Sequence, residues 1–237
     1  MSQLWKAFNT LPIFTRCILG SAIIVPILGR LINPYLLLLD YKSVFRFELW
    51  RLYTSVFFTG LSFNWLFDMF FIYQQSLFLE KQMQKKDYFF FLAFVWINLL
   101  GIAYIQGMYV LFRPFISALI YQWSRFNQDT TVTFYFGIQF KGQYLPWVYV
   151  LMEYLTPAPN PVPPLIGILV SHGYYYATTK ELITTPKVFE TIYNKYLYPA
   201  EPVEGPHVAS VNAGRPSSGP GQPAARPHTW GRGNRLG

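Results

Sequence analysis

This sequence has little of the charge and cysteine that most soluble or disulfide-linked domains carry. Only 13% of its 237 residues are charged, whereas about a quarter of the residues in a soluble domain are charged. Its single cysteine, Cys17, excludes a disulfide framework within the chain and a zinc site made of several cysteines. Nucleotide-binding and metal-binding motifs are also missing, so the sequence predicts no cofactor.

The net charge is +8, but the lysines and arginines form no cluster interleaved with aromatic residues, so nucleic-acid binding is not expected. Hydrophobic residues instead make up 52% of the chain. They gather in six runs: Ile13–Ile32, Val56–Leu79, Tyr88–Tyr104, Met108–Trp123, Tyr144–Leu155 and Val162–Ala177. Such runs are typical of transmembrane helices. We therefore expect an all-α membrane protein with a bundle of six transmembrane helices.

The positive charges indicate how the spans are oriented, because lysine and arginine accumulate on the cytosolic side of a membrane. With six spans, both chain ends lie on one side. That side carries fourteen of the nineteen positive residues: Lys6, Arg16, Lys81, Lys85, Lys86, Arg125, Lys141 and the seven from Lys180 onward. The other five are Arg30, Lys42, Arg46, Arg51 and Arg113. Both termini are therefore expected in the cytosol.

The fifth run, Tyr144–Leu155, is short for a membrane span. Its twelve residues would form about 18 Å of helix, whereas the hydrocarbon core of a bilayer is about 30 Å thick. One interpretation is a longer helix with polar ends that reach into the flanking residues. The other is that the protein thins the bilayer around its fifth and sixth spans.

The predicted spans also contain polar residues: Asn64, Asp68, Asn98, Glu153 and His172. Such groups are costly in hydrocarbon and usually face a bundle interior or a wet cavity. Asp68 follows Asn64 by one helical turn, which predicts an inward polar stripe. For Glu153 the simpler expectation is that its carboxylate reaches the luminal interface. For His172 it is a hydrogen-bonded interior position.

Two amphipathic elements accompany the spans. In "TTVTFYFGIQFKG", hydrophobic residues alternate with polar ones from Thr131 to Phe140, which predicts an extended segment with one apolar face. Near residues 186–198, apolar residues recur at helical spacing, with Thr185 as a candidate N-cap and Pro186 in the first turn. This pattern predicts an interfacial helix on the cytosolic leaflet.

Serine and histidine inside membrane helices raise the question of an intramembrane serine protease. Such an enzyme needs an accessible serine beside a histidine base and oxyanion donors. His172 is present, but Ser117 lies between Ile116 and Ala118 without a G-x-S-G motif. Ser171 is adjacent to His172 and points to a different side of the helix. No catalytic residue is therefore expected.

Gly167 and Ser171 form a small-x-x-x-small pair in the sixth span. Pairs of this kind let two helix backbones approach closely. They also occur by chance in membrane helices, and that interpretation stays open here.

Five motifs occur in order across residues 11 to 189: "LPIFTR", "ELWRLYTSVFF", "NQDTTVTFYFGIQFKGQYLPWVYV", "GILVSHGYYY" and "TPKVF". Together they resemble the Derlins, rhomboid-like pseudoproteases of the endoplasmic reticulum. The resemblance implies a rhomboid-like bundle over residues 1–198 and no catalytic serine. Trp50 and Arg51 match the family's W-R signature in the luminal loop, although the pair also suits simple anchoring at an interface. Gly167 matches the first glycine of the rhomboid G-x-x-x-G, and Ser171 replaces the second.

Residues 199–237 are rich in Pro, Gly, Ser and Ala and are expected to form a disordered cytosolic tail. The tail ends in "WGRGNRLG", residues 230–237, which resembles the SHP box by which Derlins bind the valosin-containing-protein-type AAA ATPase. Trp230 and Leu236 would fill apolar pockets, and Arg235 would contact the rim. Gly231 and Gly233 would let the peptide backbone approach the partner closely.

The resemblance implies a non-enzymatic component of endoplasmic-reticulum-associated degradation. Its expected partners are the ATPase, a membrane ubiquitin ligase complex, misfolded proteins, the lipid bilayer and further copies or homologues in an oligomer. It would help misfolded proteins return to the cytosol, as part of a channel or by thinning the bilayer. Two alternatives stay open: an active rhomboid-type protease, and a membrane channel that works alone.

Overall fold

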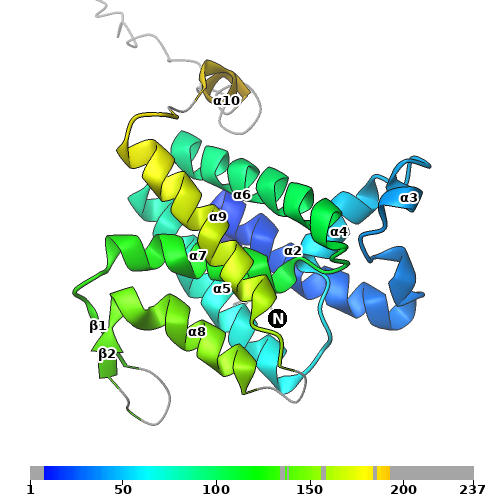
Figure 1. The fold of residues 1–237 in the computed structure, drawn as a ribbon, viewed down its shortest axis with the longest axis horizontal. Coiled ribbons are helices and arrows are strands. Elements are labelled where there is room, and N and C mark those ends of the chain that lie inside the picture. The colour runs from blue at the N-terminus through cyan, green and yellow to red at the C-terminus, as the bar shows by residue number, and fades with distance from the viewer. Residues whose placement is uncertain (1–7, 134–136, 138, 156–158, 184–185, 193–237) are drawn as a thin grey trace, which may run out of the picture. The chain divides into compact units, whose positions relative to one another are not determined.

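The computed structural model describes residues 8–133, 137, 139–155, 159–183 and 186–192. These residues form a mostly helical bundle (Figure 1). In chain order its elements are α2 (Ile13–Leu31), the 3-10 helix η1 (Pro34–Leu36), α3 (Tyr41–Val44), α4 (Trp50–Phe57), α5 (Phe63–Gln82), α6 (Lys85–Gln106), α7 (Phe112–Phe126), β1 (Thr131–Thr133), β2 (Gln139–Lys141), the 3-10 helix η3 (Gly142–Tyr144), α8 (Leu145–Tyr154), α9 (Val162–Thr179) and α10 (Lys187–Ile192).

Helix α7 lies at the centre of the bundle. It contacts α4, α5, α6, α8 and α9, and its most extensive interface is with α9, which lies across it in Figure 1. Phe112, Ile116 and Ile120 on α7 are fully buried. A helix with this many buried apolar side chains is expected at a position that neighbours enclose.

Helices α2 and α6 are, in the part of the chain that the structure describes, long and apolar enough to cross a membrane. On α6, Ile97 and Ile105 are 63% and 83% exposed, although both are large and apolar. Such exposure suits a helix that faces lipid. Helix α6 ends at Gly107, whose φ of +67° is the left-handed conformation that glycine adopts readily at a helix end.

Two predicted spans begin later than expected. Val56 belongs to α4, and α5 starts only at Phe63, because the intervening segment contains Thr59, Gly60 and Ser62, which have low helix preference. The fourth run was expected from Met108, but α7 starts at Phe112. Just before it, the Leu111 N–H donates to the Ser55 carbonyl oxygen at 2.9 Å, which holds this connection against the loop before α5.

The fifth run forms a helix even shorter than expected. Helix α8 has ten residues and follows directly on η3, so the longer helix with polar ends is not observed. The sixth run forms the longer helix α9, which has 18 residues, about 27 Å of helix, and so comes close to the thickness of the hydrocarbon core. The short length of α8 therefore remains as a reason to expect local thinning of the bilayer.

The alternating segment after α7 forms an antiparallel hairpin of β1 and β2. Val132 pairs with Phe140, which places two of the predicted apolar positions opposite each other. The hairpin lies close to the end of α7, where a Cβ on Gly142 would collide with the Asn127 carbonyl oxygen.

Helix α10 falls within the segment predicted to be an interfacial helix, and Thr185 and residues 193–198 lie outside the described part. The Phe189 ring contacts the rings of Phe89 and Phe90 at the start of α6, with centroid separations of 5.3 and 5.1 Å. Helix α10 therefore packs on the bundle and does not only lie on a lipid surface.

Candidate functional site

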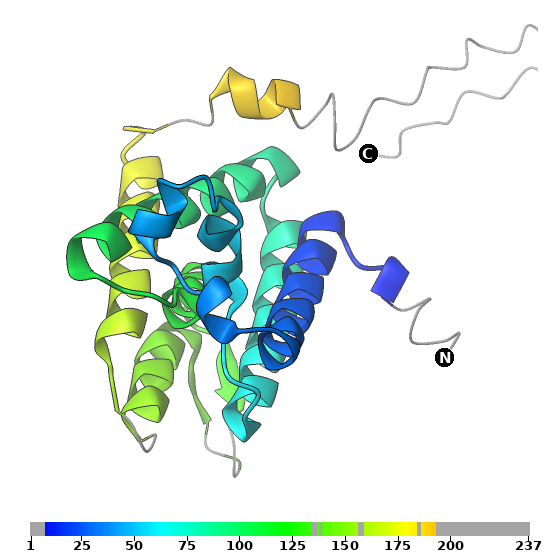
Figure 2. The same cartoon turned by 90° about the vertical axis from the view of Figure 1, so that its right-hand side faces the viewer.

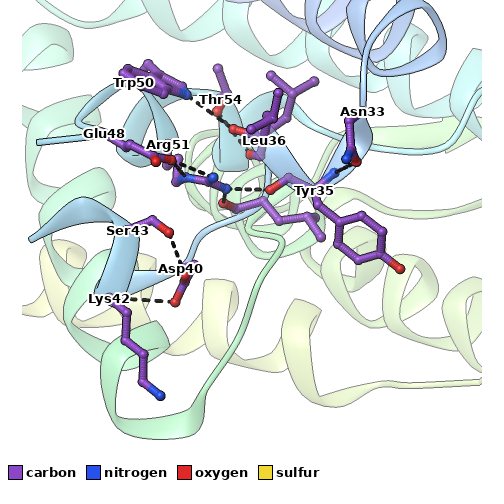
Figure 3. A network of polar contacts seen from close by, with 12 residues as sticks. Asn33, Tyr35, Leu36, Asp40, Lys42, Ser43, Glu48, Trp50, Arg51 and Thr54 are labelled. Atoms are coloured by element: carbon purple, nitrogen blue, oxygen red, sulfur yellow. Dashed lines mark hydrogen bonds and ion pairs between the residues drawn. The ribbon is translucent and has the colours of Figure 1, made fainter. Parts of the chain in front are cut away.

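The loop between α2 and α5 (residues 32–62) is organised around Arg51, and it faces the viewer in Figure 2. Arg51 is 6% exposed. Its Nη1 donates to the carbonyl oxygens of Tyr35 and of Leu38, the latter at 3.0 Å, and its Nε donates to Glu48 Oε2 at 2.6 Å (Figure 3). A guanidinium carries five donors in a rigid fork, so one side chain can hold the segment around Tyr35 and Leu38 against the start of α4.

Further hydrogen bonds shape the same loop. Trp50 Nε1 donates to the Leu36 carbonyl oxygen at 3.2 Å, while its ring is 52% exposed. Asp40 caps α3, because its carboxylate accepts bonds from the Lys42 N–H and the Ser43 hydroxyl. The bond from Ser43 is the main reason why the pKa of Asp40 is below its usual range.

The loop is also attached to the bundle. The Leu39 N–H donates to the Tyr109 carbonyl oxygen at 2.9 Å, and Trp96 Nε1 donates from α6 to the Leu52 carbonyl oxygen at 3.1 Å. The signature pair therefore lies in a loop that the fold holds in one conformation. Arg51 is its central donor, and Trp50 contributes one bond at the surface.

Gly167 and Ser171 both lie at the interface of α9 with α7. A Cβ on Gly167 would collide with the Pro114 carbonyl oxygen and Ser117 Oγ. Only glycine lets the two backbones approach this closely. Ser171 is fully buried, and its hydroxyl has no hydrogen-bond partner among the described residues. The small pair therefore coincides with the most extensive helix interface of the bundle.

Ser117 and His172 each contact other groups. The fully buried Ser117 hydroxyl lies 2.8 Å from the Pro164 carbonyl oxygen and 3.0 Å from that of Pro114, and it donates to them. His172 Nδ1 lies 2.6 Å from the Tyr121 hydroxyl. The histidine ring is exposed, so the expected interior position is wrong, although the hydrogen bond is present.

The polar residues of the predicted stripe do not share one environment. Asp68 is 4% exposed and accepts a hydrogen bond from the Tyr149 hydroxyl on α8 at 3.1 Å. Asn64, one turn earlier, is exposed, so the stripe does not extend to it. Asn98 is half-buried and donates to the Phe94 carbonyl oxygen of its own helix at 2.8 Å.

Glu153 forms a buried ion pair with Arg113 and does not reach an interface as expected. Its side chain is 8% exposed, and that of Arg113 is 28% exposed. Arg113 also stabilises the Asp68 charge electrostatically. Arg113, Glu153, Asp68 and Tyr149 thus form a polar cluster that links α5, α7 and α8.

Sequence reasoning missed three members of these networks. It overlooked Arg113 and Tyr149 in the polar cluster. It also overlooked Glu80, which is 3% exposed and accepts from the Phe14 and Thr15 N–H groups at 3.0 and 2.6 Å. Glu80 thereby caps α2 from α5. The available signal was the carboxylate of Glu80 directly after the second apolar run, since a buried charge needs partners.

A groove of about 820 Å³ lies between α5, the ends of α7 and α8, and strand β1. Its α5 wall is mostly apolar and includes Leu66, Phe70 and Phe78, and Trp123 closes the α7 side. Gln75 also lines it; this side chain is 5% exposed, and its Oε1 has no hydrogen-bond partner in the described part of the chain.

Within the described ranges, no group of three or more His, Cys, Asp or Glu side chains could hold a metal ion. The predicted ATPase-binding residues Trp230, Gly231, Gly233, Arg235 and Leu236 lie outside the described residues.

Helices α2 and α6, in the described part of the chain, are long and apolar enough to cross a membrane, and comparisons with known proteins identify the family. The Der1-like family matches residues 11–195. Derlin-1 of Mus musculus is 31% identical, with 100% of this chain and 99% of the relative aligned. Derlin-1.2 of Zea mays is 35% identical over 88% of each chain, and Derlin-1 of Caenorhabditis elegans is 32% identical over 75% of this chain and 79% of the relative. This chain belongs to the Der1-like, or Derlin, family.

Proposed function

We propose that this protein is a non-enzymatic component of endoplasmic-reticulum-associated degradation. In this proposal it lies in the membrane of the endoplasmic reticulum and helps misfolded proteins reach the cytosol. Membership of the Der1-like family supports this role, and the groove beside the short helix α8 is the observation that carries it.

The proposed arrangement has six membrane spans, formed by α2, α5, α6, α7, α8 and α9. Both termini then lie in the cytosol, and the loop pinned by Arg51 lies in the lumen. The distribution of lysine and arginine supports this orientation, because fourteen of nineteen fall on the cytosolic side.

A route for clients follows from the shortness of α8, whose first residue, Leu145, lines the groove. Helix α8 has ten residues, about 15 Å of helix, against a hydrocarbon core of about 30 Å. A bilayer next to such a helix must thin or admit water. The groove would then give a client segment an apolar wall on α5 and a shortened hydrocarbon path, which lowers the cost of moving polar peptide groups.

The non-enzymatic assignment is supported by the hydrogen bonds of the two residues that catalysis would need. Ser117 is buried and donates to backbone carbonyl oxygens, and His172 is bonded to Tyr121. A nucleophilic serine must instead be accessible and bonded to its base. The energy for extraction would come from an AAA ATPase bound to Trp230 and Leu236, and a membrane ubiquitin ligase complex would modify the clients.

Site-directed photo-cross-linking tests the client route. A photoreactive residue at Phe70, which is 54% exposed in the groove, should capture a misfolded client during its degradation. The matched control is Ile97 on α6, which is 63% exposed and does not line the groove. Equal client capture from both positions would contradict the groove as the route, and capture from neither would contradict client handling by this bundle.

A further inference from the structure

A row of polar side chains follows the outer boundary between α7 and α9. It consists of Tyr121 and Arg125 on α7 and His172 and Tyr175 on α9, and we call it the α7–α9 seam. The Tyr121 hydroxyl lies 2.6 Å from His172 Nδ1. About one turn further along both helices, the Arg125 guanidinium carbon lies 4.5 Å from the centre of the Tyr175 ring.

The seam faces outward from the bundle. His172 and Gly173 are exposed, and their neighbours on the same face, Leu169 and Tyr176, are 66% and 54% exposed. A Cβ added to Gly173 would meet no atom within 4 Å. The seam is therefore separate from the groove, which lies against α5 and the hairpin.

The seam retains hydrogen-bond donors that the described protein groups do not use. A neutral histidine has one N–H and a tyrosine has one O–H. The single bond between Tyr121 and His172 uses one of these two donors, whichever way it runs, so one donor remains. Arg125, whose guanidinium lies over the Tyr175 ring, adds a cation.

In the proposed six-span arrangement, this polar seam runs from mid-membrane to the cytosolic end of α9. His172 is seven residues before the last residue of α9, Thr179, which corresponds to about 10 Å of helix. An exposed donor at the depth of His172 is costly in hydrocarbon unless water or a polar group reaches it. Since this remaining group is a donor and Arg125 nearby is a cation, an anionic acceptor complements the two.

We propose that the α7–α9 seam binds phospholipid headgroups of the cytosolic leaflet, drawn inward together with water. Arg125 holds the phosphate at the cytosolic end, and the Tyr121–His172 pair carries the hydrated path toward mid-membrane. The proposal rests on the proposed membrane arrangement. It adds a second surface, away from α8, at which the protein deforms the bilayer.

Thiol accessibility tests the hydrated path. Cys17, the only cysteine of the chain, is the fifth residue of α2 and is exposed. Its rate of modification in the unmodified protein serves as the reference. A Cys17→Ser, Gly173→Cys variant places the thiol on the seam. Position 173 is further from the cytosolic end of α9 than Cys17 is from the cytosolic end of α2. In phosphatidylcholine vesicles, a small charged methanethiosulfonate reagent should modify Cys at 173 about tenfold faster than Cys17, because the seam is wet. Adding Tyr121→Phe and His172→Leu should remove the difference.

Headgroup binding needs its own measurement. Native mass spectrometry should show that the detergent-purified protein retains dioleoylphosphatidylglycerol but not dioleoylglycerol, which lacks the phosphate. Arg125→Leu should lose that retention, while Arg16→Leu, at the cytosolic end of α2, should keep it. Equal retention of both lipids, or unchanged retention in Arg125→Leu, would overturn the headgroup assignment.

Slow modification at position 173, at the rate of Cys17, would show that lipid tails or a second protein helix cover the seam, and this result would overturn the hydrated path. Client cross-linking from Phe70 does not depend on the seam. A failure of this inference and a failure of the proposed function are therefore distinguishable.

Discussion

Ser117 on α7 donates a hydrogen bond to the carbonyl oxygen of Pro164 on α9, with 2.8 Å between the two oxygens. Beside this bond, Gly167 lies so close to α7 that a methyl group would not fit. The serine at this position is thus a packing residue in the tightest helix interface of the bundle.

The first prediction concerns this interface. Ser117→Ala should lower the free energy of unfolding by about 1 kcal/mol, since one buried hydrogen bond is lost. Gly167→Ala should be more harmful because its methyl group overlaps backbone, and thermal unfolding in detergent would rank the two variants. Neither the wild-type protein nor Ser117→Ala should react with a fluorophosphonate probe. Labelling of the wild-type protein that disappears in Ser117→Ala would contradict the non-enzymatic assignment.

The second prediction concerns the loop between α2 and α5. Arg51→Lys should expose this loop, because an ammonium group cannot reproduce the guanidinium's bonds to Glu48 and to two carbonyl oxygens. The loss of about 2 kcal/mol should raise amide hydrogen exchange of Leu39 roughly thirtyfold. Trp50→Phe is the matched control and should change exchange little, since it removes one surface bond. Unchanged hydrogen exchange of Leu39 in Arg51→Lys would show that backbone contacts alone are enough to hold the loop in place.

The third prediction concerns the buried ion pair of Arg113 and Glu153. Arg113→Gln should destabilise the bundle more than Glu153→Gln, because it leaves an 8% exposed carboxylate and also removes the cation near Asp68. The difference should be on the order of 2 kcal/mol in thermal or chemical unfolding. The double variant should be milder than Arg113→Gln alone. An equal loss of unfolding free energy in the two single variants would mean that solvent stabilises the Glu153 carboxylate once Arg113 is removed.

The fourth prediction concerns the short helix α8. Four leucines inserted after Tyr154 should lengthen it by about 6 Å, reduce the mismatch with the bilayer and slow client extraction. This position leaves Glu153 paired with Arg113, whereas an insertion before Glu153 would break that contact. Cryo-electron microscopy in nanodiscs should show less pinching of the headgroup layers beside α8. Four serines inserted at the same place are the control. Flat headgroup density around the unmodified protein would contradict local thinning of the bilayer beside α8.

The fifth prediction concerns the C-terminal residues. Trp230→Ala and Leu236→Ala should each weaken ATPase binding by about 2 kcal/mol or more, since each removes an apolar anchor. Arg235→Ala should matter less, and mainly at low salt, because rim charges are screened. Pull-down of the ATPase with the full-length protein in detergent measures this. Wild-type recruitment by the Trp230→Ala, Leu236→Ala double variant would show that the ATPase binds elsewhere.

The extended chain of the hairpin and the helix-rich organisation could be predicted from local patterns. The alternation around Val132 and Phe140 indicates extended chain, although the pairing of β1 with β2 came from the structure. The start of α5 at Phe63 has a local signal, because Thr59, Gly60 and Ser62 before it have low helix preference. The start of α7 at Phe112 could not be predicted in this way, because apolar residues continue across it, and the hydrogen bond from the Leu111 N–H to the Ser55 carbonyl oxygen holds the chain just before it.

Only the tertiary structure shows which groups the polar residues bond to. Asp68 and Asn64 are one turn apart in an apolar run, yet Asn64 is exposed, whereas Asp68 is buried and bonded to Tyr149 from a helix about eighty residues away. His172 was expected inside and lies outside, because α9 turns its small residues, Gly167 and Ser171, toward α7. Composition and periodicity are local properties, and they sufficed to predict an apolar, mostly helical chain, while the resemblance to the Derlins came from short motifs. Which side chain is buried, paired or exposed was decided by the packing of helices that lie far apart in the chain.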